Sequence, residues 1–277
     1  MKNILLPTDF SENSLNAINY ALELFRSFEI DFFVLNVQKV SGYTTSELMT
    51  AAPSSSIYQG VLEDNKLKVQ NLVKKLALEN SSEKFNFEAL LDYDVFTDAL
   101  RQAVKSHEID LIIMGTNGAT GTKEAIFGSN TLKVIRNVNC PLLVVPEGYS
   151  FQNIKSVLFS NNAKMKISFA GLKPLKSILR RFKPVINVLE ITEENIPLQE
   201  VESDFSIEDT LNEFEFKYFE IKDVPLLSAI KTFQQLIPID LHALFIEKEG
   251  FIDRLIFGSA TSAINYNSDK PLLIMHP

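Results

Sequence analysis

The chain has 277 residues, more than one typical domain of roughly 100–200 residues, and its net charge is −8. With 45% hydrophobic residues, 22% charged residues and Cys140 as the only cysteine, it is neither a disordered chain, a fibrous repeat nor a disulfide scaffold. The negative charge disfavours a nucleic-acid binder, and no apolar run approaches the roughly 18 residues that span a bilayer. The first residues also lack a signal-peptide core, so we expect a cytoplasmic protein that binds no membrane.

Along the first half of the chain, short apolar runs alternate with segments of helical periodicity. The predicted strands are Ile4–Leu6, Phe32–Val37, Phe85–Leu91, Leu111–Met114 and Leu142–Val145. The predicted helices are one that begins after an N-cap at Ser11 and buries Leu15, Ile18, Leu22 and Phe25, then Asn65–Leu78, Val95–His107 and a last one from Gly128-Ser129. Strands that are apolar on both faces and alternate with helices indicate an α/β fold with a doubly wound, five-stranded parallel sheet.

The segment 41–59 is rich in serine and threonine and shows no clear period. It follows the second predicted strand, at the edge of the sheet where such folds bind ligands. We expect a long loop there, either a flap over a binding site or a disordered segment.

The chain contains this pattern twice. The segment 110–146 recurs as 240–276 at a constant offset of 130, so that Gly128-Ser129 corresponds to Gly258-Ser259. The opening strand, Asn3–Asp9, recurs as Ser156–Asn162, and Val34–Val37 recurs as Val185–Val188. We therefore predict a tandem duplication, with one domain at 1–147 and a shorter, degenerate copy at 153–277.

The glycines after the fourth predicted strand carry the clearest chemical signal. Gly115 and Gly118 allow the backbone to bend sharply and to approach a ligand closely. Gly128-Ser129 begins a helix, where free N–H groups, a hydroxyl and the positive end of the helix dipole suit a phosphate. The spacing fits neither a Walker A loop nor a dinucleotide fingerprint.

The spacing Gly115-x2-Gly118-x9-Gly128-Ser129, after Pro7-Thr8-Asp9 near the start, resembles the universal stress protein family. The resemblance covers 1–146 well and 153–277 in degenerate form, as in tandem-domain members. It implies an adenine nucleotide α-hydrolase-like sheet of strand order 3-2-1-4-5, whose ligand lies at the carboxyl ends of the strands where the order reverses. It also implies an ATP-binding protein of the stress response, and Mg²⁺ is compatible as a counter-ion of the phosphates.

The resemblance also implies roles for single residues. Asp9, which follows Pro7 and Thr8, would face the adenosine or simply cap the next helix, and Val37 would meet the adenine edge or be core. The remaining positions would line the ribose (Met114 and Gly115), hold the phosphates (Gly118, Gly128, Ser129 and Asn130) and either approach the phosphates or cap the helix (Thr131).

No catalytic or metal-binding set stands out. His107, His242 and His276 have no partner at metal-ligand spacing, and we interpret them as structural. No reaction is assigned beyond slow ATP hydrolysis as an incidental property.

The two copies differ at the site. At the offset of 130, Gly115 corresponds to Phe245 and Gly118 to Lys248, so we expect only the first domain to bind nucleotide. The family resemblance implies that the two domains pair through their final strands, so Pro141–Pro146 and Pro271–Pro277 are expected to lie antiparallel and to form an intrachain pseudo-dimer. A basic stretch, Lys164–Lys183, and an acidic one, Glu190–Asp223, are interpreted as solvated surfaces that face each other.

Three functions remain open at this stage. The first is a nucleotide-binding regulatory protein, the second an interaction module that has kept the fold and lost the ligand, and the third and weakest an adenylating enzyme. A further homodimer and an unidentified protein partner are also left open.

Overall fold

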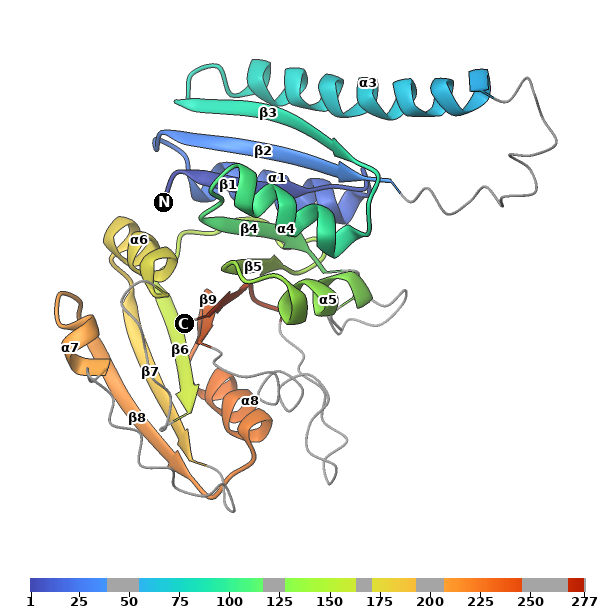
Figure 1. The fold of residues 1–277 in the computed structure, drawn as a ribbon. Helices are drawn as coiled ribbons and strands as arrows, with labels where there is room; N and C mark the ends of the chain where they lie inside the picture. Colours follow the sequence, from blue (N-terminus) through green and yellow to red (C-terminus); the bar gives the residue numbers. More distant parts are fainter. Residues whose placement is uncertain (39–54, 117–127, 163–170, 193–206, 246–268, 277) are drawn as a thin grey trace.

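A computed structural model describes residues 1–38, 55–116, 128–162, 171–192, 207–245 and 269–276. Ten strands form one continuous sheet in the order β3-β2-β1-β4-β5-β10-β9-β6-β7-β8 (Figure 1). The first half supplies β1 (Asn3–Pro7), β2 (Ile30–Val37), β3 (Phe85–Asp92), β4 (Leu111–Gly115) and β5 (Leu142–Val145). The second half supplies β6 (Ser156–Asn162), β7 (Val185–Thr192), β8 (Phe216–Lys222), β9 (Leu241–Phe245) and β10 (Leu272–Met275).

Each half is a parallel sheet of order 3-2-1-4-5, as predicted, when its own strands are numbered in sequence. The registers of the two halves also correspond at the predicted offsets. Ile4 pairs with Leu111 in the first half, and Val157 pairs with Leu241 in the second. The tandem α/β architecture is therefore confirmed.

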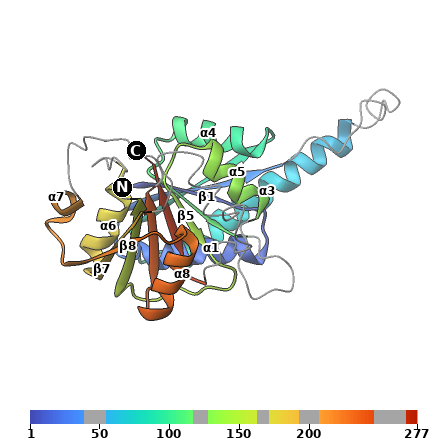
Figure 2. The same ribbon diagram turned by 90° about the horizontal axis from the view of Figure 1, so that it is seen from below.

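Helices cover both faces of the sheet. One face packs against α1 (Glu12–Leu24), α3 (Ser55–Glu79), α6 (Lys173–Phe182) and the short α7 (Ile207–Leu211). The other face packs against α4 (Phe96–Ser106), α5 (Ser129–Asn137) and α8 (Leu226–Leu236). Figure 2 shows α4 and α5 on one side of the first-half strands and α1 on the other. Apolar residues on both faces of each central strand explain the two buried layers.

Helix α1 begins as its sequence predicts. Ser11 is the N-cap, and its hydroxyl accepts a hydrogen bond from the Ser14 N–H at 3.2 Å. Ile18, Leu22 and Phe25 are buried against the sheet, which confirms the predicted core face. The cap fixes where α1 starts relative to the end of β1.

Two details of the sequence-based prediction were wrong. Helix α3 already begins at Ser55, so residues 55–59 are helical and not part of a loop, while residues 39–54 lie outside the described part of the chain. The stretch between Ser55 and Asn65 contains no proline, so nothing in it stops the helix from starting early.

The second error concerns the repeat of Val34–Val37. Leu6 pairs with Val34 in the first half, but its counterpart Phe159 pairs with Val188 and not with Val185. Two strands that are apolar on both faces can be matched in more than one register, because every register places apolar side chains in a core. The sequence match therefore did not determine which residues correspond.

The halves join through β5 and β10, which pair antiparallel as predicted. Leu143 lies opposite Leu273, and both side chains are fully buried. Tyr149 and Phe151, which follow β5, pack against Tyr20 of α1, and the Tyr20 and Phe151 ring centroids are 5.4 Å apart. Two strands that would otherwise be exposed sheet edges protect each other in this way.

The basic surface of α6 meets acids, in line with the predicted facing of the two stretches. Arg180 forms a two-pronged ion pair with Glu213, and its Nη2 lies 2.9 Å from Oε1. Lys176 approaches the same carboxylate at 3.7 Å. Lys173 pairs with Asp110 of the first half at 2.6 Å, which adds a polar link between the halves.

Candidate functional site

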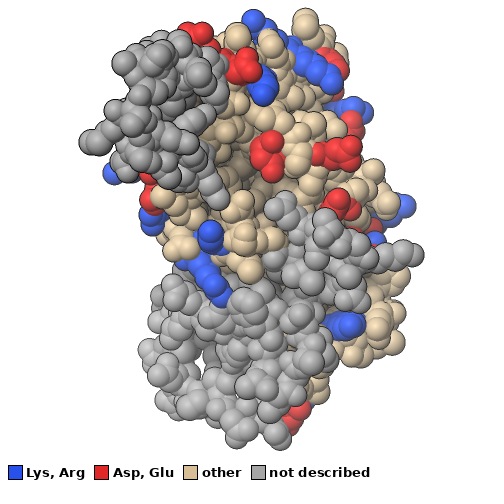
Figure 3. All heavy atoms as spheres, turned by 90° about the vertical axis from the view of Figure 1, so that its right-hand side faces the viewer, with Lys and Arg blue, Asp and Glu red and all other residues tan. Residues whose placement is uncertain are grey.

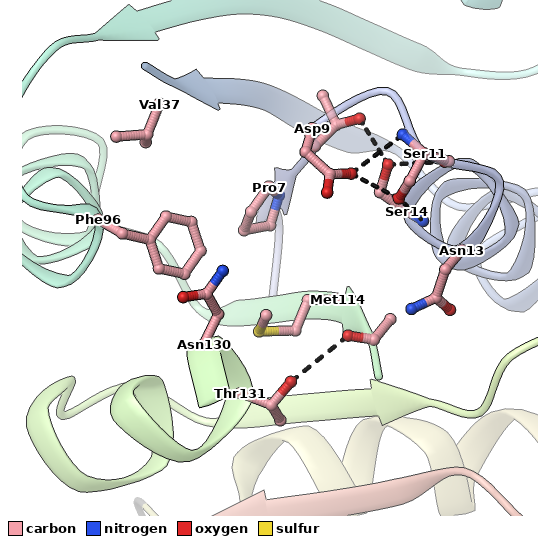
Figure 4. A pocket seen from close by; sticks show the side chains of 12 residues that line it. Pro7, Asp9, Ser11, Asn13, Ser14, Val37, Phe96, Met114, Asn130 and Thr131 are labelled. Carbon is pink, nitrogen blue, oxygen red and sulfur yellow. Dashed lines mark hydrogen bonds between the residues drawn. The ribbon is translucent and has the colours of Figure 1, made fainter. Parts of the chain in front are cut away.

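A cavity of about 120 Å³ opens at the carboxyl ends of β1 and β4 (Figure 4). This is the switch point of the first half, because β1 has β2 on one side and β4 on the other. The residues that line the cavity are Pro7, Thr8, Asp9, Ser11, Asn13, Ser14, Val37, Phe96, Met114, Gly115, Asn130 and Thr131.

The sequence predicted most of this set. Eight of the eleven residues proposed from sequence line the cavity: Pro7, Thr8, Asp9, Val37, Met114, Gly115, Asn130 and Thr131. Gly128 is the N-cap of α5 and Ser129 its first residue, and both lie just outside the cavity lining. Gly118 falls outside the described residues.

Four lining residues were not predicted as site residues. Ser11, Asn13 and Ser14 belong to the cap and the first turn of α1, and Phe96 begins α4 after β3. The signal that could have found them is topological. Helices that follow parallel strands begin at the same edge of the sheet as the ligand site, so their first residues face it.

A tight turn presents Asp9 to the cavity. Phe10 adopts a left-handed backbone with φ of 64°, which turns the chain from β1 into α1. The Asp9 Oδ1 accepts hydrogen bonds from the Ser11 N–H at 3.0 Å and the Ser11 hydroxyl at 2.5 Å. Burial raises the pKa of Asp9, but hydrogen bonds from Ser11 and Ser14 outweigh it and hold the pKa below its usual value. Asp9 is therefore a carboxylate at neutral pH.

Behind Asp9, a network of polar groups fixes the end of β1. The Thr8 and Ser14 hydroxyls are 2.9 Å apart, and the Asn36 side chain donates to the Thr8 carbonyl at 2.6 Å. All three side chains are buried. A satisfied buried network of this kind holds its members in one geometry, so the cavity wall is rigid on this side.

Gly115 has a packing reason to be a glycine. A Cβ at this position would lie 2.8 Å from the backbone oxygen of Asn13 and 2.7 Å from its Cγ. The Asn13 side chain also donates a hydrogen bond to the carbonyl of Thr116. Helix α1 thus crosses the end of β4 so closely that no side chain fits between them.

Helix α5 brings its first turn to the cavity. The Leu132 N–H bonds to the Gly128 carbonyl at 3.1 Å, so the N–H groups of residues 129–131 precede the first intrahelical bond. The Thr131 side chain is buried, and its hydroxyl donates to the Gly115 carbonyl at 3.5 Å. The N–H groups of residues 129–131 have no backbone partner in the described part of the chain, and together with the helix dipole they make this turn suitable for an anion.

No group of three or more His, Cys, Asp or Glu side chains in the described part of the chain is arranged to hold a metal ion. Cys140 is buried, and burial raises the pKa of its thiol to about 12. His242 is fully buried beside the Ser160 hydroxyl at 2.6 Å, and burial lowers its pKa to about 3. Both groups are therefore neutral at physiological pH.

Figure 3 views the molecule from the side on which β1 and β2 end, and acidic side chains gather near the middle of this face. Asp9 contributes one such charge to the cavity wall. Among the described residues, no lysine or arginine lines this cavity.

Comparison with known proteins agrees with this geometry. A sequence profile of the universal stress protein family matches residues 1–146, which include every element that surrounds the cavity. The chain belongs to the universal stress protein family. Universal stress protein MJ0531 of Methanocaldococcus jannaschii is 31% identical over 144 residues, which cover 52% of this chain and 81% of that protein.

The tandem form is also found in other universal stress proteins. Universal stress protein Slr1230 of Synechocystis is 26% identical over 305 aligned positions, which cover 99% of both chains. A universal stress protein from Archaeoglobus fulgidus has a crystal structure that superposes with a TM-score of 0.71 at 16% identity, covering 98% of this chain and 97% of that one. The chain thus shares its two-part fold with a solved universal stress protein over nearly its whole length.

The second half of this universal stress protein differs where Gly115 stands in the first. Strand β9 spans Leu241–Phe245 and β4 spans Leu111–Gly115, so both ends correspond at the offset of 130. Phe245 is fully buried and belongs to the core, whereas no side chain fits at Gly115. Lys248 and Gly258-Ser259 fall outside the described residues.

In the described part of the chain, no helix is long and apolar enough to cross a bilayer.

Proposed function

We propose that the first half, residues 1–147, binds ATP or a closely related adenine nucleotide and that the second half, 153–277, does not. The cavity at the switch point of the first half carries this proposal, because most of the residues expected from sequence line it. We also propose that nucleotide occupancy serves a regulatory role in the stress response, in the cytoplasm.

The donors and acceptors around the cavity fit an adenine nucleotide. Asp9 offers a carboxylate with a lowered pKa, which suits the hydroxyl or amino donors of a nucleoside. Asn13 lines the cavity, and its Oδ1 has no hydrogen-bond partner among the described residues, so a ligand donor could satisfy it. Val37 and Phe96 add apolar surface for a base.

The phosphates would lie toward α5. Asn130 and Thr131 line the cavity there, and the free N–H groups of the first turn can donate to phosphate oxygens without a counter-charge from lysine or arginine. Ser129, the first residue of the helix, adds a hydroxyl, and Gly118 completes the motif. Mg²⁺ would neutralise the phosphate charge beside the acidic face when it accompanies the nucleotide.

The second half is proposed to act as a built-in partner of the first. Antiparallel pairing of β5 with β10 supports this role, since it occupies the sheet edge of both halves. The fully buried Phe245 supports the absence of a second nucleotide site, because a bulky core side chain replaces the glycine that allows close approach.

The two copies provide a matched test within one chain. Ser129→Ala removes the hydroxyl at the start of α5 and should weaken ATP binding by about tenfold, since a hydrogen bond to a charged group contributes roughly 1.5–3 kcal/mol. Ser259→Ala, its counterpart at the offset of 130, should leave the affinity unchanged. Isothermal titration calorimetry on the full chain measures both. If the two variants lose affinity equally, the asymmetry between the halves is wrong.

A third variant addresses the glycine motif. Gly118→Lys copies the second half's Lys248 and should abolish ATP binding. Unchanged ATP binding in Gly118→Lys would contradict the site. A wild-type chain that binds no nucleotide would instead favour an interaction module of the same fold.

A further inference from the structure

A second cavity lies where the two halves meet, near the starts of β1 and β2. The first cavity lies at the other end of these strands. The second cavity has a volume of about 370 Å³, at the lower end of the range of pockets that bind small organic ligands. Figures 1 and 2 both show α6 of the second half beside the start of β1, on the side away from the carboxyl ends of the first-half strands. The apolar lining comes from both halves, with Leu24, Phe25, Phe28 and Ile30 from the first and Ile178 and Phe182 from α6.

Two arginines of α6 also line this cavity, and they differ in their partners. Arg180 is neutralised by its two-pronged ion pair with Glu213. The Arg181 guanidinium instead stacks on aromatic rings, 4.6 Å from the centroid of Phe28 and 5.0 Å from that of Phe182. Within the described part of the chain, no carboxylate forms an ion pair with Arg181.

The acid whose charge acts on Arg181 is already engaged elsewhere. The negative charge of Glu83 raises the pKa of Arg181. Glu83 itself accepts a hydrogen bond from the Ser27 N–H at 2.7 Å and forms an ion pair with Arg26 at 3.7 Å. Burial lowers the pKa of Arg181, and Glu83 only partly opposes this effect. A partly buried cation without a bonded anion is unfavourable, and a carboxylate from a ligand would relieve it.

From this arrangement, we propose that the junction cavity binds a small amphipathic monocarboxylate, whose acid group pairs with Arg181 and whose apolar tail lies among the phenylalanine and aliphatic side chains. A single charge on the ligand matches a single free guanidinium, because Arg180 is occupied by Glu213. A phosphate dianion would leave excess charge beside an apolar lining. The ligand would contact both halves and hold them together.

Octanoate is a suitable probe, at concentrations below those at which it forms micelles, with octylammonium as the control of opposite charge. Octanoate should bind the full chain in calorimetry and raise its Tm, because it binds only the folded state. Octylammonium, with the same tail, should not bind. Saturating ATP should leave octanoate affinity unchanged, since the proposed nucleotide cavity lies at the carboxyl ends of β1 and β4, away from the junction cavity.

Two neighbouring variants locate the carboxylate. Arg181→Gln should weaken octanoate binding about tenfold or more, as expected for a lost charge-assisted hydrogen bond. Lys183→Gln, which removes a positive charge two residues along from Arg181 but outside the cavity lining, should bind octanoate within about twofold of the wild-type chain. The proposal is overturned by any of four results: no octanoate binding, equal binding of octylammonium, competition by ATP, or an Arg181→Gln variant that binds as well as the wild type.

Discussion

The close approach of α1 to the end of β4 at Gly115 predicts that Gly115→Ala destabilises the first half. A Cβ there would lie 2.8 Å from the Asn13 backbone oxygen, whereas ordinary contacts begin at 3.4 Å, so α1 would have to withdraw by about 0.6 Å. Overpacking of this kind costs roughly 1–3 kcal/mol, and the entropy that alanine removes from the unfolded chain offsets about 0.4–1 kcal/mol of it. The net loss should be about 1–2 kcal/mol, or ~2–6 °C in Tm.

Thermal unfolding followed by circular dichroism measures this loss, and a second variant separates its causes. Asn13→Ala removes the Cγ and Oδ1 contacts but leaves the backbone oxygen in place, so it should relieve Gly115→Ala only in part. ATP affinity should fall together with Tm in Gly115→Ala, because both residues line the cavity. A Gly115→Ala chain as stable as the wild type would refute the packing argument.

Two further predictions concern pH and assembly. Because the pKa of His242 falls from 6.5 to about 3 in the folded chain, only the unfolded chain gains its proton between these values. Stability should therefore decrease as the pH falls below about 6, by up to ~1.4 kcal/mol per pH unit, and His242→Gln should flatten this slope in urea unfolding at several pH values. Residues 1–147 expressed alone expose the edge of β5, which pairs with β10 in the full chain, and should form a homodimer in light scattering. A strictly monomeric fragment would contradict this.

The sequence predicted the positions of most strands and helices well, because period and capping are local signals, whereas the strand order 3-2-1-4-5 was implied by the family resemblance. Ser11 caps α1 as its residue type suggests, and Leu142–Val145 forms β5 with the predicted bounds. The pairing of β5 with β10 was inferred from the family resemblance rather than from the residues. The repeat of Val34–Val37 failed for a physical reason: apolar side chains on both faces of a strand carry no information about register.

The candidate site was predicted less completely than the fold. The family resemblance implied that Asp9, Gly115 and Thr131 lie near one ligand, and all three line the cavity. It could not predict Asn13 or Phe96, because the contacts of these residues depend on how α1 and α4 cross the sheet edge. The junction cavity has no motif at all, since its lining is assembled from residues far apart in sequence.

The central claim is that one of the two copies binds nucleotide. Titration of ATP into the intact chain, with the protein freed of bound ligand by denaturation and refolding, gives the number of sites directly. Mass spectrometry of the released fraction identifies any adenine nucleotide that was carried along. The account predicts one ATP per chain, bound in the half that contains Gly115, whereas two ATP molecules per chain, or none, would contradict it.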